Sequence, residues 1–151
     1  MLYLNGLFKE YFSESDPYKV LQRLEGKVYR QVKSRKTFQF EHNGRSYFAK
    51  LHDGVGWLEI FKNLIRLKLP VLGARVEWDA IKRLNQISIA TMNVVGFGQR
   101  GWNPAKIQSF IITEDLRETI SLEEFCLEWR DSPPAHSTRM VLIKEVARIA
   151  S

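Results

Sequence analysis

The sequence predicts an α+β fold built on a small antiparallel sheet. Residues 27–42 and 45–52 alternate apolar and polar side chains and flank Asn43-Gly44, the strongest short signal for a β-hairpin. Apolar residues then recur at helical spacing over residues 57–69 and again from Glu77 onward. A chain of 151 residues with 44% hydrophobic residues can form one globular domain with its own core.

Composition restricts the class of protein and of partner. The formal net charge of +6 fits an acidic partner such as a nucleotide, a phosphorylated glycan, an anionic lipid or a nucleic acid. The single cysteine, Cys126, excludes an internal disulfide and a metal cluster made of cysteines. Because neither a secretion leader nor an apolar run of membrane-spanning length is present, we expect a cytoplasmic protein.

The first half of the sequence predicts short helical segments, strands and two longer helices. Residues 3–12 and 17–24 are short amphipathic segments ahead of the hairpin. In residues 57–69 Trp57, Ile60, Phe61, Leu64 and Leu67 form an apolar stripe beside a basic face, and Pro70 is expected to end this helix. The helix that begins at Glu77 is expected to bury Trp78, Ile81, Leu84 and Ile87.

The second half predicts two more strands and two more helices. Residues 91–97 and 108–113 are apolar, strand-like runs separated by a loop over residues 98–104. Ser121 and Glu124 have the spacing of a capping box, which predicts a helix as far as about residue 129. Residues 131–134 break this helix, and residues 138–150 have a helical pattern that reaches the end of the sequence.

Lys50 is the residue most suggestive of chemistry. Side chains alternate across a strand, so Phe48, Lys50 and His52 share one face of the second hairpin strand, where a lysine beside a phenylalanine requires an anion. A strand with a lysine, a helix with a glutamate, two more strands and a polar turn is the order of a protein-kinase-like amino-terminal lobe. In that lobe the lysine binds the α- and β-phosphates of ATP and the glutamate holds the lysine. Lys50 and Glu77 are therefore the predicted ATP-binding pair.

The same order predicts further contacts with the nucleotide. Residues 113–116 follow the last strand as a hinge would, which places the Glu114 carbonyl and the Leu116 amide near an adenine edge. No Gly-x-Gly-x-x-Gly loop precedes Lys50. The corresponding segment is basic, so phosphate contacts are expected from its cations, which are Arg30, Lys33, Arg35 and Lys36. Phe48 is bulky where protein kinases place a small residue, which disfavours an ordinary adenine pose.

Purely structural interpretations remain for each of these features. Lys50 could be a surface residue of an edge strand, and Glu77 could simply complement the dipole of its helix. His42 and His52 have no second ligand at metal spacing and read as ordinary strand residues. The basic helix over residues 57–69 could pack on the sheet, or it could rest on anionic lipid or phosphorylated glycan.

Many segments in one order resemble a known family. They are Arg35-Lys36-Thr37, Tyr47-Phe48-Ala49-Lys50, Gly54-Val55-Gly56-Trp57, Glu59-Ile60-Phe61-Lys62-Asn63-Leu64, Leu69-Pro70-Val71-Leu72-Gly73-Ala74, Glu77-Trp78, Asn103-Pro104-Ala105, Ser109-Phe110-Ile111-Ile112-Thr113-Glu114-Asp115-Leu116 and Thr119-Ile120-Ser121-Leu122-Glu123. Over nearly its whole length the chain resembles the lipopolysaccharide core heptose(I) kinase family of Gram-negative bacteria. The resemblance implies a protein-kinase-like fold and transfer of a phosphoryl group from ATP, with Mg²⁺, to a heptose of the inner core. It also implies action at the cytoplasmic face of the inner membrane, peripheral contact with anionic lipid, and acyl carrier protein as an acidic partner.

The family's catalytic residues are not expected within this chain. Kinases of this type carry the catalytic Asp and the magnesium ligands in the second lobe, which would follow Ser151. Asp115 lies in the hinge and Asp131 lies beside a Pro-Pro loop, so neither can substitute. We therefore expect residues 1–116 to form a kinase-like lobe with an amino-terminal extension, and residues 117–151 to begin an incomplete second lobe.

Three other functions stay open at this point. The chain could be a non-catalytic, pseudokinase-like binding module, or part of a kinase that acts on another inner-core sugar such as Kdo. A nucleic-acid-binding domain is suggested by charge alone. Because the sequence has neither a recognition-helix motif nor a platform of exposed aromatics interleaved with basic residues, no nucleic-acid partner is expected.

Overall fold

The computed structural model describes residues 1–32, 34–67 and 73–150. The chain divides into two compact units, Met1–Asp115 and Leu116–Ser151, which are described one at a time. The expected lobe boundary between residues 116 and 117 remains a prediction. Lys33, Leu69, Pro70 and Leu72, which the sequence interpretation used, lie outside the described residues.

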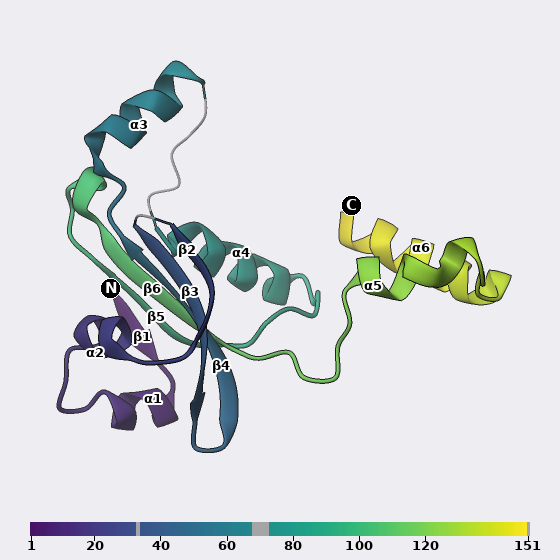
Figure 1. Ribbon diagram of the computed structural model, residues 1–151, viewed down its shortest axis with the longest axis horizontal. Coiled ribbons are helices and arrows are strands. Elements are labelled where there is room, and N and C mark those ends of the chain that lie inside the picture. Colours follow the sequence, from purple (N-terminus) through teal and green to yellow (C-terminus); the bar gives the residue numbers. More distant parts are fainter. Residues whose placement is uncertain (33, 68–72, 151) are drawn as a thin grey trace. The chain divides into compact units, whose positions relative to one another are not determined.

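The first unit is built on one sheet, confirming the predicted α+β class. Among the described residues the sheet has six strands in the order β1-β5-β6-β4-β3-β2, and every neighbouring pair is antiparallel (Figure 1). In chain order the strands are β1 (Leu2–Leu4), β2 (Lys27–Val32), β3 (Arg35–His42), β4 (Arg45–Asp53), β5 (Val94–Arg100) and β6 (Gln108–Glu114).

The predicted hairpin joins β3 to β4. Asn43 and Gly44 both have left-handed backbone angles, with φ of 49° and 70°, as the tight two-residue turn requires. The turn sets the register, so that Phe38 pairs with Ala49 and Thr37 with Lys50. The side chains of β4 consequently alternate between a buried face and a half-buried face, as predicted for Lys50.

The amino-terminal extension covers one face of the sheet. Helices α1 (Gly6–Tyr11) and α2 (Pro17–Arg23) lie on this face (Figure 1). Their residues Phe8 and Leu21 are completely buried in the core. Asn5 and Asp16 begin the two helices, since each side chain accepts a hydrogen bond from a backbone N–H of the first turn. The sequence predicted amphipathic pieces here, and the structure shows that they complete the larger core.

Helix α4 (Arg75–Gln86) covers the opposite face. Trp78 stacks on Phe97 with ring centroids 4.9 Å apart, and Ile81 is buried beside them. The helix begins two residues before the predicted start at Glu77. The prediction that Ile87 is buried is wrong, because the helix ends there and Ile87 is exposed, while Ile89 enters the core.

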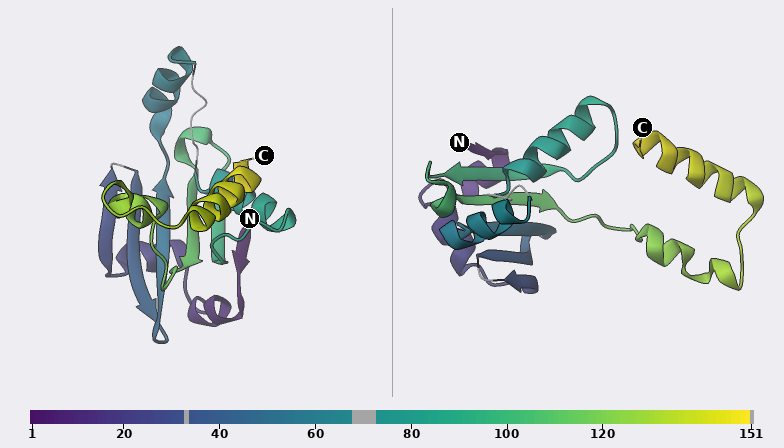
Figure 2. Two further views of the ribbon diagram at one scale, coloured as in Figure 1. Left: turned by 90° about the vertical axis from the view of Figure 1, so that its right-hand side faces the viewer. Right: turned by 90° about the horizontal axis from the view of Figure 1, so that it is seen from above.

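Helix α3 (Gly56–Ile65) differs most from the sequence expectation. It ends at Ile65 instead of reaching residue 69, and Leu67 takes a left-handed backbone angle of 51°. Ile60 is buried, but Trp57, Phe61 and Leu64 are 51%, 57% and 49% exposed. The interpretation in which this stripe packs on the sheet is therefore wrong; α3 extends past the end of β4 and contacts the short 3₁₀ helix η1 (Pro104–Lys106) (Figures 1 and 2).

The strand predicted over residues 91–97 is shifted towards the carboxyl end. β5 runs from Val94 to Arg100 because it pairs on both sides, with β1 and with β6. The extra residues Gly98, Gln99 and Arg100 were assigned to a loop in the sequence. Strand β1, which the sequence did not predict, supplies the pairing on the outer side of β5.

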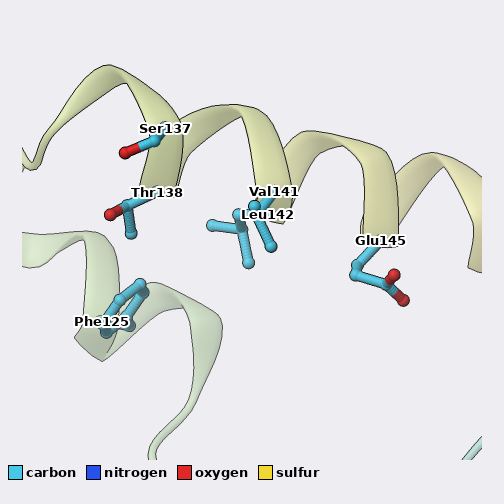
Figure 3. A pocket seen from close by; sticks show the side chains of 6 residues that line it. All are labelled: Phe125, Ser137, Thr138, Val141, Leu142 and Glu145. Atoms are coloured by element: carbon cyan, nitrogen blue, oxygen red, sulfur yellow. The ribbon is translucent and has the colours of Figure 1, made fainter.

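The second unit contains α5 (Leu122–Cys126), the 3₁₀ helix η2 (Leu127–Arg130) and α6 (His136–Ala150). The predicted capping box is present, because Ser121 and Glu124 each bond the other's backbone N–H. Phe125 faces Val141 and Leu142 across a cavity of about 450 Å³ (Figure 3). None of the described helices is long and apolar enough to span a membrane.

A polar cluster fastens α2 to the end of β5. Arg100 Nη1 donates to Asp16 Oδ2 at 2.8 Å, and the guanidinium lies 4.1 Å from the centroid of the Tyr18 ring. The hydrogen bond from Arg100 lowers the pKa of Asp16, and burial raises the pKa of Tyr18 to about 12. The Tyr18 ring packs in turn on Phe110, with centroids 5.0 Å apart.

Gly98 lies beneath this cluster and leaves no room for a side chain. A Cβ atom at residue 98 would lie 2.4 Å from Phe110 Cε1 and 2.9 Å from the Tyr18 hydroxyl. We expect Gly98→Ala to lower the free energy of unfolding by about 1 to 3 kcal/mol, as overpacking of a rigid core does. Chemical denaturation, monitored by circular dichroism, measures this free energy of unfolding.

Gly6→Ala is the matched control, because a Cβ at Gly6 would meet nothing within 4 Å. This variant should stay within about 0.5 kcal/mol of the wild type. Equal stabilities of the two variants would contradict the close packing at Gly98.

Candidate functional site

The predicted pair of Lys50 and Glu77 is formed. Lys50 Nζ lies 2.5 Å from Glu77 Oε1, joining the middle of β4 to the first turn of α4. The two side chains keep 34% and 26% of their surface exposed, so the pair is accessible from solvent. It can therefore meet a ligand without unfolding of either element.

The start of α4 is fixed to the sheet by a buried serine. Ser109 Oγ on β6 accepts a hydrogen bond from the Ala74 N–H at 2.9 Å, immediately before the helix. Gly73 permits this approach, because a Cβ there would lie 2.5 Å from Ser109 Oγ. Trp78, one helical turn after Ala74, packs against Phe97 on the sheet. These two contacts hold Glu77, which lies between them in the sequence, in a fixed position relative to Lys50.

A cavity of about 370 Å³ opens beside the ion pair. It is lined by Arg30, Arg35, Thr37, Lys50, Leu51, His52, Gly73, Val76, Glu77 and Ala80. Arg35, a predicted site residue, thus lies with Lys50 and Glu77, and Arg30 joins them from β2. Cationic side chains that converge on one cavity favour an anionic ligand.

Lys36, another predicted phosphate cation, is not part of this lining. Lys36 Nζ lies 4.6 Å above the centroid of Phe38, a residue buried in the core on the opposite face of β3. Strand alternation separates Lys36 from its neighbours Arg35 and Thr37. Lys33 lies outside the described residues.

His52 also lines the cavity, and its electrostatic state is unusual. Burial lowers its pKa, and the Arg35 guanidinium, which faces it across the β3–β4 ladder, adds to this effect. Its Nδ1 atom is buried and has no hydrogen-bond partner in the described part of the chain. The imidazole is accordingly held neutral near physiological pH.

The two predicted adenine contacts lie where the units meet in sequence. Glu114 ends β6, and its N–H donates to the Asn93 carbonyl oxygen at 2.9 Å. Leu116 begins the second unit, where its carbonyl oxygen accepts from Thr119 Oγ1. Phe48, on the same face of β4 as Lys50, packs against Tyr29 with centroids 5.2 Å apart. The adenine contacts remain predictions.

Comparison with known proteins agrees with this arrangement. Residues 19–151 match the model of the Lipopolysaccharide kinase (Kdo/WaaP) family. The chain belongs to this family.

Curated members of the family are similar to nearly all of the chain. A lipopolysaccharide core heptose(I) kinase WaaP of Pseudomonas aeruginosa is 47% identical over 98% of this chain and 55% of its own length. A protein of the same name from Escherichia coli is 46% identical over 97% of this chain and 56% of its own length. The chain therefore spans about half the length of the curated relatives it matches.

A solved structure gives the same result for the fold. The structure described as WaaP in complex with acyl carrier protein superposes with a TM-score of 0.82 at 39% identity, covering 98% of this chain and 54% of that chain. The kinase-like α+β architecture predicted from the order of strands and helices is thus confirmed for this member of the Kdo/WaaP family.

Two residues near the site carry weak signals in the sequence. Ser109 could have been singled out as one of two hydroxyl residues, with Thr113, in an otherwise largely apolar strand. His52 could have been singled out by its spacing from Lys50, because residues two apart share a strand face. In the sequence both read as ordinary strand residues.

The expectation that the magnesium ligands lie outside this chain remains a prediction. No group of three or more His, Cys, Asp or Glu side chains in the described part of the chain could hold a metal ion. Asp115 accepts a hydrogen bond from Gln39 Nε2 at 2.8 Å, and Asp131 caps η2. Asp115 is not among the residues that line the cavity beside Lys50.

The hydrogen bond from Ala74 to Ser109 should be measurable as stability. Ser109→Ala leaves the buried Ala74 N–H without an acceptor, so we expect a loss of about 1 to 3 kcal/mol in the free energy of unfolding. Ser13→Ala, at an exposed position, should change it by less than about 0.5 kcal/mol. Denaturant titration of both variants makes the comparison, and equal midpoints would show that Ser109 does not fix α4.

Proposed function

We propose that this chain is the amino-terminal part of an ATP-dependent kinase that phosphorylates a heptose in the inner core of lipopolysaccharide. The observation that carries the proposal is the ion pair between Lys50 and Glu77 at the edge of a cavity that also receives Arg30 and Arg35. The names of the relatives support the substrate class. Residues 1–116 would form the kinase-like lobe with its extension, and residues 117–151 would begin the second lobe.

In this function the cavity receives the phosphate chain of ATP. Lys50 bridges the α- and β-phosphates, Glu77 keeps the ammonium in place, and Arg35 adds charge-assisted hydrogen bonds. The Glu114 carbonyl and the Leu116 amide bind the adenine edge. Catalysis of phosphoryl transfer depends on such positioning and on electrostatic stabilisation, which a lysine held by a second rigid element provides.

Magnesium is implied by the kinase class, and it would neutralise the phosphate charge as the phosphoryl group leaves. Among the described residues no group of three or more His, Cys, Asp or Glu side chains could hold the ion. We place its ligands and the catalytic Asp after Ser151. The residues of this chain bind and orient the nucleotide.

We also propose peripheral contact of the kinase with the cytoplasmic face of the inner membrane, through α3. Trp57, Phe61 and Leu64 are exposed there, and Lys62 and Arg66 lie close by in sequence, a combination that suits anionic lipid. Sedimentation with phosphatidylglycerol vesicles tests this. Unchanged binding of a Trp57→Asp, Phe61→Asp variant would contradict it.

Acyl carrier protein is proposed as a protein partner. The support is the solved WaaP complex and the net charge of +6, which suits an acidic protein. Joint elution of the two purified proteins in size-exclusion chromatography is the test, and separate elution at low salt would exclude a stable complex.

The acceptor sugar has one specific alternative. The family description names Kdo beside WaaP, so a Kdo hydroxyl is the second candidate acceptor. Incubation of the complete enzyme with ATP, Mg²⁺ and core oligosaccharide, followed by mass spectrometry of the separated sugars, distinguishes heptose phosphate from Kdo phosphate. Nucleotide-dependent thermal stabilisation with neither product would favour a non-catalytic binding module instead.

Lys50 is the residue by which the kinase function can be tested most directly. In the complete enzyme Lys50→Ala removes the phosphate contact, and we expect turnover to fall roughly a hundredfold or more while the fold is kept. Lys50→Arg should not restore activity, because a planar guanidinium cannot replace a compact ammonium between Glu77 and the phosphates. Glu77→Gln should be milder, since the lysine keeps its charge and an acceptor.

Steady-state kinetics on core acceptor measures the three variants, with circular dichroism to verify folding. Lys9→Ala, a substitution of an exposed lysine on α1, is the control and should leave turnover unchanged. A folded Lys50→Ala enzyme with nearly normal turnover would disprove the assigned role.

A further inference from the structure

We propose that His52 is a phosphate ligand that takes up a proton when a polyphosphate enters the cavity beside Lys50, so that nucleotide binding is linked to pH. This proposal rests on the proposed function, because it assigns a further residue to the same nucleotide site. It concerns a class of ligand, linear polyphosphates such as the tail of a nucleoside triphosphate.

Geometry places His52 inside the cationic cavity. It follows Lys50 by two residues on the same face of β4, and it pairs with Arg35 on β3 and with Ser109 on β6. His52 lines the cavity together with Lys50 and Arg35. An anion that contacts the ammonium and the guanidinium there is thus within reach of the imidazole.

The hydrogen bonding of His52 is incomplete without a ligand. Buried side-chain nitrogens almost always have a partner, and an unmade hydrogen bond at such an atom is costly. His52 Nδ1 is buried and unpaired within the described residues. A protonated imidazole donates from both ring nitrogens, and phosphate oxygens that enter the cavity can accept from the ring while they also accept from Arg30, Arg35 and Lys50.

Charged groups on each neighbouring element decide the protonation state. Arg35 and Lys50 oppose a proton on His52, and burial acts in the same direction. Glu77 and Asp53 favour it. Arg30 on β2 adds a further positive charge to the cavity lining.

The two carboxylates are already engaged by other groups. Glu77 Oε1 is bound to Lys50, and Asp53 Oδ1 accepts from Gln22 Nε2 and Gln108 Nε2, each at 3.1 Å. The ring therefore stays neutral until a strong anion arrives. A polyphosphate reverses the local field, so the pKa of His52 is higher in the complex than in the free protein.

The sign of the pH dependence follows from this difference. Because the complex binds the proton more tightly than the free protein, binding takes up a proton. Affinity is greatest below the pKa of the free protein and falls as the pH rises through the pKa of the complex. We expect an affinity for tripolyphosphate about tenfold lower at pH 8 than at pH 6.

The experiment uses this chain with inorganic tripolyphosphate and with MgATP. The pKa of His52 is read from the pH dependence of its ring C–H resonances by NMR, with and without saturating tripolyphosphate. Isothermal titration calorimetry in two buffers of different ionisation enthalpy counts the protons taken up. The expected results are a raised pKa of His52 in the complex and net proton uptake.

Matched histidine variants separate the imidazole from the ligand's own titration. His52→Asn should abolish the excess proton uptake and flatten the dependence of affinity on pH. His42→Asn should change neither, because His42 packs on Tyr11 and Phe8 with centroids 4.3 and 5.6 Å away on the other face of the sheet. Proton uptake by the phosphates themselves is common to all three proteins.

Each outcome decides between the two proposals. An unchanged pKa of His52 at saturating tripolyphosphate, or the same pH dependence in His52→Asn, overturns the role of His52 and leaves the kinase function intact. If Lys50→Ala binds tripolyphosphate as tightly as the wild type does, the proposed role of Lys50 in the nucleotide site is overturned. The pKa of His52 can still rise in that case, because it is a separate measurement. Absence of binding by the wild-type chain contradicts both.

Discussion

The alternation of side chains along β4 is the constraint on which the site depends. β4 lies between β3 and β6, so its register is fixed on both edges. Tyr47, Ala49 and Leu51 enter the core beneath α1 and α2, while Lys50 and His52 face α4. A slip of one residue would drive the lysine into that core, where an unpaired charge is very costly. The strand register that buries the core residues therefore also places the Lys50 ammonium on the opposite face of the sheet.

The ion pair matters for geometry more than for stability. Partly exposed pairs of this kind contribute about 0 to 1 kcal/mol, because water solvates both partners well when they are apart. Glu77 offsets the charge of Lys50, and Arg30 and Arg35 bring further positive charge to the cavity lining. In chain order these arginines occupy the segment where protein kinases carry a glycine-rich loop. Binding of phosphate by side-chain charge should depend on ionic strength more strongly than binding by backbone dipoles.

Local patterns in the sequence were enough to predict the hairpin and the capping box, which depend on turn chemistry and reciprocal capping. The pairing of Lys50 with Glu77 was predicted from the order of strands and helices, which is that of a protein-kinase-like lobe. The periodicity of apolar residues did not predict which surface each apolar helix face packs against. It marked the stripe of α3, which is largely exposed, and it did not reveal that α1 and α2 cover the sheet. Ser109 was missed because its importance arises from a long-range hydrogen bond to Ala74.

The junction between β4 and α3 connects the cavity to the exposed apolar helix. Gly54 has a φ of 67°, and a Cβ there would lie 2.7 Å from the Ala105 carbonyl oxygen, so this turn is closely packed against η1. Gly56 has a φ of 74° and begins α3. Because both glycines hold left-handed angles that other residues rarely adopt, the direction in which α3 leaves β4 is set by the sequence. A surface that binds α3 would therefore stand at a defined distance from Lys50, which suits the proposed kinase, whose nucleotide would be soluble and whose acceptor would be attached to a membrane.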